Sequence, residues 1–305
     1  MKKQVLFLMI CLSLLMVACY APAKVTPTTE PIISSIPDPT GGFTPEPTVL
    51  EIEIFGWRYE DDILHIENDE GMANWDDLRK TRNEQVVQIK EKVEEIILYE
   101  GVTFIANHAF GNCKNLKSIE LPEELLTIGS GAFHSCESLT SIVIPDSVME
   151  IGGSAFRSCT SLFSIKLPPG LTRLSAEMIA NCTNLGELYI PESVSLIGEF
   201  ALHCIGSKRI VFEGTIDTIV RIELDEIPNL EQLVFLNGPP IDYLRITEAV
   251  DGLMFQEGLL FPEEINFTVY YLSENADKWA PNGETEWNGC PLVAIDSLDD
   301  LPPLN

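Results

Sequence analysis

A 23-residue repeat dominates the middle of this chain, from Val93 to Leu236. Leu or Ile followed by Pro recurs at this step, and one Cys and one Leu recur in register with it. The recurring positions are Leu121-Pro122, Ile144-Pro145, Leu167-Pro168 and Ile190-Pro191; Cys113, Cys136, Cys159 and Cys182; and Leu116, Leu139, Leu162 and Leu185. Self-similarity at a fixed period of this length indicates a solenoid or a propeller. The chain is therefore expected to stack copies of one unit.

Each repeat reads as one turn of a solenoid, which we call a coil. Residues Leu139–Ile144 predict a short strand, and Pro145 ends it because proline has no N–H to donate. Gly152 suits a tight bend, where a positive φ is open to glycine. Phe156 is expected to fill the interior, and Cys159 to close the coil as a small buried residue. One coil cannot bury its own apolar face, so neighbouring coils must stack, with strands about 4.8 Å apart.

Residues 139–159, with the sequence LTSIVIPDSVMEIGGSAFRSC, resemble one repeat of the BspA-like (Treponema pallidum type) leucine-rich repeat family. Three more segments resemble parts of proteins in that family. They are Gly56–Trp75, which resembles the N-terminal cap, Val93–Cys113, which resembles the first coil, and Phe267–Asp296, which resembles the closing unit. The resemblance implies a leucine-rich repeat solenoid, β-rich and of the α/β class, with caps at both ends. It also implies a bacterial surface protein that takes part in adhesion or in contact with host or neighbouring cells.

Composition and repeat together divide the chain into five segments. These are residues 1–19, a lipoprotein signal peptide; 20–48, a linker rich in Pro and Thr; 49–92, an N-terminal cap; 93–236, the solenoid; and 237–305, degenerate repeats with a C-terminal cap. The repeat loses its Gly and its Ala-Phe pair at Ser175–Ile179, and it dissolves after Cys204. We expect a less regular core at these places.

The first 19 residues predict export and lipid attachment. Lys2 and Lys3 precede the apolar run Val5–Val17, which is too short for the usual membrane-spanning helix. The run is followed by a short motif ending at Cys19 that resembles the bacterial lipoprotein signal. Cys19 is therefore expected to receive the diacylglyceryl group. An ordinary cleaved signal peptide is the alternative. The linker that follows is too rich in proline to fold and is expected to hold the domain away from the membrane.

Further elements are expected on either side of the regular repeats. In the N-terminal cap, two strands are predicted around a turn at Tyr59–Asp62, followed by a helix from Trp75 into the first coil. Beyond Cys204, strands are predicted at Lys208–Phe212 and Leu230–Phe235, with the last one at Val269–Leu272. The tail Asp296–Asn305 is expected to fray.

The formal net charge of the chain is −28 at pH 7. Such acidity argues against a nucleic-acid partner, because nucleic-acid binding needs basic patches. It also argues against adsorption on anionic lipid, so the lipid anchor would have to provide membrane attachment. No calcium-loop motif is present, and we therefore expect neither a metal nor a cofactor.

The sequence does not predict an enzyme. His134 and His203 occupy equivalent repeat positions three coils apart, too far apart to share a metal or a proton, and no catalytic fingerprint accompanies them. A hydrolase with an unrecognised site at His134 or Cys136 is the alternative. The recurring cysteines are expected to be free buried thiols, although neighbouring coils would also allow disulfide bonds. Cys290 lies outside that pattern and would be the most reactive thiol if exposed.

The outward-facing positions of the strands supply the candidate site. Several of them are apolar or aromatic where solvent is expected, and such patches mark interaction surfaces. The candidate binding residues are Glu120, Val143, Phe163, Lys166, Tyr189 and Val211. The expected partner is a protein or a glycan. Two alternatives remain open at this point: a passive spacer whose strand surface is covered or merely tolerates β-forming residues, and a lipoprotein that captures oligosaccharides or peptides.

Overall fold

The structure, a computed structural model, describes residues 56–223, 227–240, 244–246, 256–260 and 267–304. The chain divides into two compact units, Met1–Pro45 and Glu46–Asn305, and all described residues belong to the second. The predicted signal peptide with Cys19, the linker at 20–48 and residues 49–55 of the cap lie outside the described residues. The predictions for them are therefore not tested by the structure.

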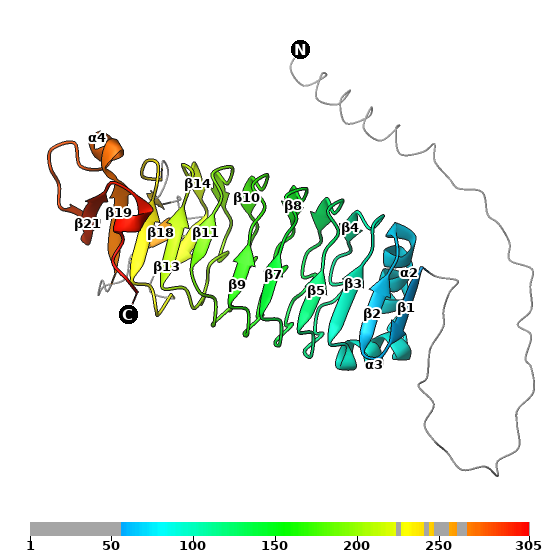
Figure 1. Ribbon diagram of the computed structural model, residues 1–305. Helices are drawn as coiled ribbons and strands as arrows, with labels where there is room; N and C mark the ends of the chain where they lie inside the picture. Colours follow the sequence, from blue (N-terminus) through cyan, green and yellow to red (C-terminus); the bar gives the residue numbers. More distant parts are fainter. Residues whose placement is uncertain (1–55, 224–226, 241–243, 247–255, 261–266, 305) are drawn as a thin grey trace, which may run out of the picture. The chain divides into compact units, whose positions relative to one another are not determined.

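The repeats form the predicted solenoid of about seven coils. The first strand of each coil lies beside the same strand of the next coil (Figure 1), and wherever two of these strands form a hydrogen-bonded ladder they run parallel. This first row consists of β3 (Glu95–Leu98), β5 (Ser118–Glu120), β7 (Ser141–Val143), β9 (Ser164–Lys166), β11 (Leu188–Ile190), β13 (Arg209–Phe212), β16 (Gln232–Phe235), β19 (Thr268–Leu272) and β21 (Cys290–Ile295). We call the outward surface of this row the strand face.

A second row of two-residue strands forms another side of each coil. It consists of β4 (Phe104–Ile105), β6 (Thr127–Ile128), β8 (Glu150–Ile151), β10 (Arg173–Leu174), β12 (Leu196–Ile197) and β14 (Thr218–Ile219). Gly129 and Gly152 follow these strands, and neither needs a positive φ. A Cβ atom on Gly152 would instead lie 2.4 Å from the backbone nitrogen of Ser130. The glycine is required because adjacent coils approach closely, which corrects the expected role in a positive-φ bend.

Tight turns make up the third side of each coil. They are joined by backbone hydrogen bonds from one coil to the next, such as Phe133 N to Ala155 O and Ser135 N to Arg157 O, both 2.8 Å. Two positions per coil adopt left-handed backbone conformations. They are His108, Gly131, Ser154, Glu177 and Phe200, and then Asn112, Ser135, Ser158, Asn181 and Cys204.

The interior holds the recurring apolar residues as stacked columns. Phe110, Phe133 and Phe156 are fully buried, with ring centroids 5.6 and 5.3 Å apart. The column then passes to Ile179 and Leu202, so the aromatic stack ends where the repeat weakens. Burial of such columns across coil boundaries provides most of the stability of a repeat protein.

The N-terminal cap begins with the predicted hairpin, β1 (Trp57–Glu60) and β2 (Ile63–Ile66). Strand β2 then pairs with β3, so the hairpin extends the first row and covers its edge. Trp75 packs edge-on against Trp57, at 5.3 Å, and its indole N–H donates to the carbonyl of Ala109 at 3.0 Å. The cap is thereby fixed to the first coil.

Two helices replace the single helix that was predicted between Trp75 and the first coil. Helix α2 (Asp69–Lys80) starts after Asn68, whose side chain accepts from the Gly71 N–H. Helix α3 (Glu84–Lys92) starts after Asn83, whose side chain accepts from the Gln85 N–H. The chain reverses between them at Arg82, with φ 54°. The prediction was wrong because the N-cap asparagine was read as part of one continuous helix.

The C-terminal part contains more structure than predicted. Strands were expected at Lys208–Phe212 and Leu230–Phe235, and β13 and β16 confirm both. Val269–Leu272 is not the last strand, because β21 follows β19 in parallel and β20 (Glu286–Trp287) pairs antiparallel with β21. The remaining elements are β15 (Arg221–Glu223), β17 (Leu244–Ile246) and β18 (Gln256–Leu260) in a small sheet, α4 (Ala276–Trp279), and the 3₁₀ turns η2 (Ser273–Asn275) and η3 (Leu298–Asp300).

The tail after β21 does not fray within the described residues. The Ser297 hydroxyl hydrogen-bonds the Asp300 carboxylate, which also accepts from the Ser297 and Asp296 N–H groups, and this fixes the turn η3. The chain then returns over the first row, where the carbonyl of Pro302 accepts hydrogen bonds from two strands. We call residues 296–304 the C-terminal tail.

Candidate binding surface on the strand face

Five of the six predicted binding residues are exposed on the strand face, and one is not. Glu120, Val143, Phe163, Lys166 and Tyr189 are exposed. Val211 is fully buried, so the expectation that it is exposed on this surface was wrong. The register is as expected: Val143 pairs with Lys166, and Tyr189 pairs with Val211. The error therefore concerns what covers Val211 and not which way it points.

Val211 belongs to a small outer cluster that the C-terminal tail covers in part. A small outer cluster of Val211, Val234, Tyr270 and Ile295 forms on the strand face, and Leu301 of the tail packs against it. The equivalent positions in the earlier coils have no such cover among the described residues, since Val143 is 66% exposed. The open part of the strand face thus ends at β11.

Three apolar side chains stand out on this open part. Phe163 is 68% exposed, Val143 66% and Tyr189 42%. Phe163 lies beside Gly186 of the next coil, where an added Cβ atom would be 3.4 Å from its ring carbons. The small residue therefore leaves room for the ring to lie against the neighbouring coil. We call Val143, Phe163 and Tyr189 the apolar cluster.

A groove of about 580 Å³ adjoins the apolar cluster. Its walls come from four successive coils, and it combines apolar surface with several carboxylates. The lining residues include Tyr189, Pro169 and Pro191, with Asp146, Glu187 and Glu213. Lys166 also lines the groove and approaches Asp146 at 3.4 Å, an exposed pair that contributes little stability.

Hydrogen bonds connect this groove to the C-terminal tail. The Tyr189 hydroxyl donates to the Glu187 carboxylate at 3.1 Å, and Arg209 donates to the same oxygen at 3.0 Å. Partial burial and the Glu187 hydrogen bond raise the pKa of Tyr189, so its hydroxyl remains a donor at neutral pH. Arg209 also donates to the Pro302 carbonyl at 3.0 Å. A chain of hydrogen bonds therefore runs from Tyr189 in the groove through Glu187 and Arg209 to Pro302 in the tail.

Glu187, Arg209 and Gln232 were not predicted as site residues. They form a second outward column, two residues before the predicted one, since Arg209 pairs with Gln232 across β13 and β16. The signal was present in the sequence, because side chains on one face of a strand recur at every second residue. The groove itself has no sequence signal, since it depends on the proline turns after the strands.

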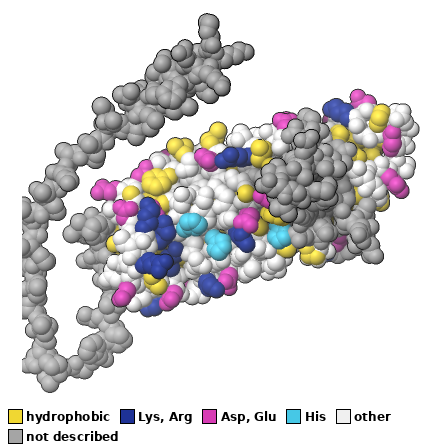
Figure 2. Space-filling view, turned by 180° about the vertical axis from the view of Figure 1, so that it is seen from behind, with side chains coloured by type: hydrophobic (Ala, Val, Ile, Leu, Met, Phe, Trp, Pro, Cys, Tyr) yellow, Lys and Arg dark blue, Asp and Glu magenta, His cyan; other side chains and the backbone are white. Residues whose placement is uncertain are grey.

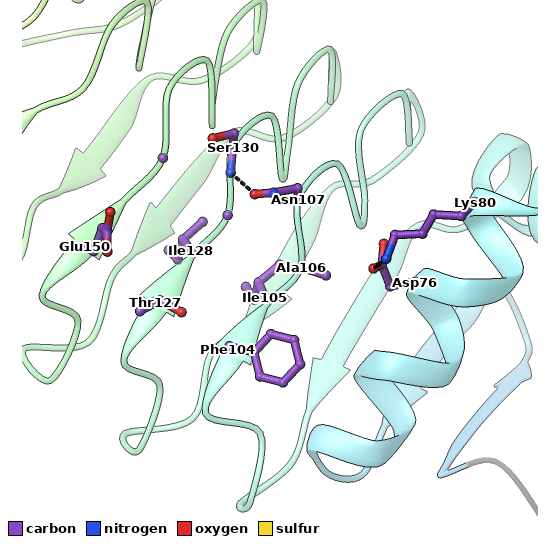
Figure 3. A pocket seen from close by; sticks show the side chains of 12 residues that line it. Asp76, Lys80, Phe104, Ile105, Ala106, Asn107, Thr127, Ile128, Ser130 and Glu150 are labelled. Carbon is purple, nitrogen blue, oxygen red and sulfur yellow. Dashed lines mark hydrogen bonds and ion pairs between the residues drawn. The ribbon is translucent and has the colours of Figure 1, made fainter. Parts of the chain in front are cut away.

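A second hollow lies on the other side of the first coils, between α2 and the second row. It has a volume of about 430 Å³ and is lined by Asp76, Lys80, Phe104 and Glu150, among others (Figure 3). Asp76 accepts from Arg79 at 2.6 Å and from Lys80 at 2.5 Å. Burial alone would raise the Asp76 pKa, but these two hydrogen bonds outweigh it and hold the pKa below its usual value. The carboxylate is thus fully occupied by its own helix.

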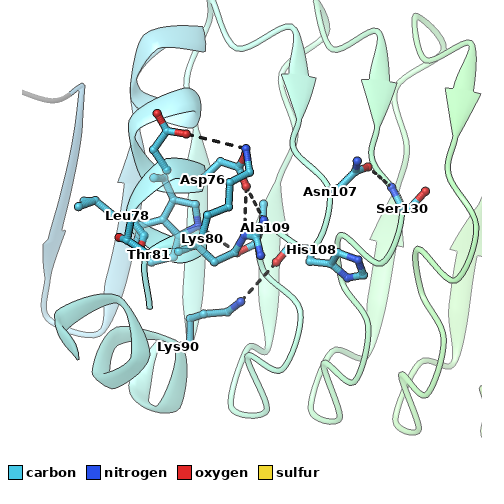
Figure 4. Close-up of polar contacts among 12 residues, drawn as sticks. Asp76, Leu78, Lys80, Thr81, Lys90, Asn107, His108, Ala109 and Ser130 are labelled. Atoms are coloured by element: carbon cyan, nitrogen blue, oxygen red, sulfur yellow. Dashed lines mark hydrogen bonds and ion pairs between the residues drawn. The ribbon is translucent and has the colours of Figure 1, made fainter. Parts of the chain in front are cut away.

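Cationic side chains gather near this cap, as the view from behind shows (Figure 2). Lys90 of α3 extends toward the carbonyl of His108, at 3.4 Å (Figure 4). Burial lowers the pKa of Lys90, and the nearby Arg79 acts in the same direction. Burial also lowers the pKa of His134, followed in effect by Arg157 and His108. Both shifts disfavour the charged forms of these side chains, as expected for basic groups that lie near one another.

The cysteines of the repeat are packing residues. Cys136, Cys159 and Cys182 donate from their thiols to the Phe carbonyl of the preceding coil, at 3.1 to 3.3 Å. Burial raises the pKa of Cys113 to about 12. No disulfide bond joins the cysteines that the structure describes. Cys290, expected to be the most reactive thiol if exposed, is fully buried and has a pKa raised by burial to about 11.

Among the residues that the structure describes, no group of three or more His, Cys, Asp or Glu side chains is arranged to hold a metal ion. None of the helices found there combines the length and the apolar character needed to cross a membrane.

Solved structures that resemble the chain are bacterial leucine-rich repeat proteins. A leucine-rich repeat protein of T. pallidum is 21% identical, over 72% of this chain and 85% of its own, with a TM-score of 0.40. A leucine-rich cell surface protein from Faecalibacterium prausnitzii is 23% identical, over 65% of this chain and 51% of its own, with a TM-score of 0.41. One from Bacteroides ovatus is 20% identical, over 70% and 60%, with a TM-score of 0.37. No curated protein matches the chain.

A family model gives the assignment. The model described as the BspA type leucine-rich repeat region matches residues 85–205 and 127–240, in six copies. The two ranges overlap, and together they span about half of the chain. The matched residues include strands β3 to β16, the Phe column and the recurring Cys residues described above. The chain belongs to the BspA-type leucine-rich repeat family.

Proposed function

We propose that this chain is a membrane-anchored bacterial surface lipoprotein whose solenoid binds a protein on a host or neighbouring cell through the strand face. The observation that carries the proposal is the exposed apolar cluster beside the groove. Phe163 and Tyr189 present aromatic surface to solvent on a chain with a net charge of −28. Aromatic residues in such a position contribute strongly to binding energy when a partner covers them. The family assignment supports an interaction role and a location outside the cytoplasm.

Binding, and not catalysis, is the proposed role. The buried thiols are protonated at neutral pH, and the cap carboxylate Asp76 is engaged by two cations of its own helix. The ionisable groups that line the groove are carboxylates, Lys166 and Tyr189, and the Glu187 carboxylate accepts from both Tyr189 and Arg209. Leucine-rich repeat solenoids are suited to binding because stacked coils create a long, continuous surface.

A capture experiment with a matched control tests the proposal. The full-length chain is immobilised and exposed to surface and secreted proteins from candidate host cells and neighbouring bacteria. The Phe163→Ala/Tyr189→Ala variant is compared with Leu126→Ala/Met149→Ala, which removes two exposed apolar side chains beside the second row. We expect the first variant to lower affinity for a captured partner by about tenfold or more, equivalent to about 1.4 kcal/mol, and the control to bind as the native chain does.

Equal binding by the native chain and the strand-face variant would contradict the proposal and direct attention to the caps or the turns. Loss of binding in the Leu126/Met149 control alone would place the site beside the second row. Failure to capture any partner would favour the spacer role.

The proposed anchor rests on Cys19, and a separate experiment addresses it. In a bacterial host supplied with labelled palmitate, the native chain is expected to carry label and to enter the detergent phase. Cys19→Ser is expected to lose the label and to enter the aqueous phase, because the thioether cannot form. Label on the Cys19→Ser variant would disprove attachment at this residue.

A further inference from the structure

The C-terminal tail lies on the strand face as an external peptide would. Its Leu301 packs on the outer cluster of Val211, Val234 and Tyr270. The carbonyl of Pro302 accepts from Arg209 Nη2 at 3.0 Å and from Gln232 Nε2 at 2.9 Å. One apolar side chain and one carbonyl therefore hold the segment across neighbouring strands.

The backbone of the tail at this point has the conformation of a polyproline II helix. Leu301 has φ −65° and ψ 134°, and two prolines follow it. A polyproline II segment makes no internal hydrogen bonds, so its carbonyls are free to accept from a partner. Prolines also reduce the conformational entropy that binding must remove. The strand face thus provides two donors that suit such a segment.

The open groove continues this chain of contacts on the adjoining coils. Arg209 contacts both Pro302 and Glu187, and Glu187 contacts Tyr189 in the groove wall. Tyr189, which pairs with Val211 on the neighbouring strand, and the exposed Phe163 provide apolar surface there. Lys166 and Ser164 provide exposed donors along the groove. Aromatic grooves with nearby donors are the surfaces on which proline-rich segments bind.

We propose that the groove at Lys166, Glu187 and Tyr189 binds an extended, proline-rich segment of the partner protein, in line with the chain's own tail. The inference rests on the function proposed above and names the part of the partner that is recognised. Asp146, Glu187 and Glu213 line the groove, so the bound segment carries neutral or basic residues around its prolines.

Fluorescence anisotropy with a defined peptide tests this inference. The probe is a labelled peptide that repeats Leu-Pro-Pro and ends in Lys, and the control peptide has Ala in place of every Pro. Both are titrated with the native full-length chain, with the Phe163→Ala/Tyr189→Ala variant and with the Leu126→Ala/Met149→Ala variant. We expect the proline peptide to bind the native chain and the Leu126/Met149 variant alike, and about tenfold more weakly to the Phe163/Tyr189 variant. The alanine peptide is expected to bind at least about tenfold more weakly than the proline peptide.

Three results would overturn the inference. They are absence of proline-peptide binding, equal binding of the two peptides, and equal binding by the native chain and the Phe163/Tyr189 variant. If a captured partner still requires Phe163 and Tyr189 while the proline peptide does not bind, the inference fails and the proposed function stands. If partner capture is itself indifferent to these residues, the proposed function fails.

Discussion

At the scale of single residues, the recurring side chains of each coil pack against the neighbouring coils and hydrogen-bond to them. The Cys column shows this most clearly. Cys136 donates its thiol to Phe110 O of the preceding coil and Cys159 donates to Phe133 O, and both side chains are fully buried. A smaller apolar residue would fill less of the space, and a serine would have a stronger desolvation cost if its bond were imperfect. The column therefore combines packing with satisfaction of a buried carbonyl.

The buried thiols predict a loss of stability in alkali. Burial raises the pKa of Cys182 from 9.0 to about 12, and that of Cys159 also rises. Between these values the unfolded chain releases thiol protons and the folded chain retains them, so rising pH favours unfolding. Each such thiol lowers the free energy of unfolding by about 1.4 kcal/mol per pH unit across this window. Urea unfolding at several pH values from neutral to alkaline measures the slope.

Cys159→Ala is the matched variant for this measurement. It should be less stable than the native chain near neutral pH, because a buried hydrogen bond is lost, and its alkaline slope should be shallower. Tyr and Lys residues titrate in both proteins and cancel in the comparison. Identical slopes in the two proteins would show that the thiol of Cys159 does not carry the effect.

Some residues could be predicted from the sequence and others could not, for physical reasons. The interior columns were predictable because apolar residues recur with a fixed period and must be buried together. The left-handed conformations of His108, Ser154 and Glu177 were not, because these residue types differ and none is glycine. Backbone hydrogen bonds to the next coil, such as Ser154 N to Ala176 O, fix these turns whatever the side chain.

At the scale of elements, the ends of the solenoid determine how much of it remains open. A β-hairpin covers the first edge of the strand row, and β20 with the C-terminal tail follows the last coils. Aromatic residues reinforce both ends: Trp57 contacts Trp75 at one, and Trp279 contacts Phe235 and Trp287 at the other. Open strand rows need such cover because their edges would otherwise pair with other chains.

The packing of the C-terminal tail predicts that substitutions at Leu301 and at Leu298 differ in their effect on the free energy of unfolding. Leu301→Asp places a carboxylate against the apolar outer cluster, so we expect it to lower the free energy of unfolding by about 1–3 kcal/mol. Leu298→Asp alters an exposed position of the same turn and should change stability by less than about 0.5 kcal/mol. Chemical denaturation of both variants measures the difference. Equal effects would mean that the tail does not pack on the strand face in solution.

The tail also shows which sequence signal was overlooked. Ser297 and Asp300 have the spacing of a capping box, a pattern that predicts an ordered turn and not a frayed end. The capping signal at Asn83 was overlooked in the same way within the N-terminal cap. What no sequence pattern could supply is the destination of the tail, because its contacts with Arg209 and Gln232 join residues far apart in the chain.

At the scale of the whole solenoid, one row of strands carries a covered part and an open part. Apolar side chains of the outward column occur in both parts. Val211 and Val234 are buried in the outer cluster against which Leu301 packs, whereas Val143 and Tyr189 are exposed, with the charged Lys166 between them. Apolar side chains of the strand face thus pack within the molecule near the C-terminal end, and in the earlier coils they are available to a partner. This division is the structural basis of the proposed binding function.

Hydroxyl-radical footprinting of the full-length chain, alone and with its captured partner, tests that function most directly. Phe163, Tyr189 and Met149 are exposed and readily oxidised side chains, and Met149 lies beside the second row, away from the strand face. The account predicts that the partner protects Phe163 and Tyr189 from oxidation and leaves Met149 unchanged. Protection of Met149 with unchanged oxidation of Phe163 and Tyr189 would contradict it.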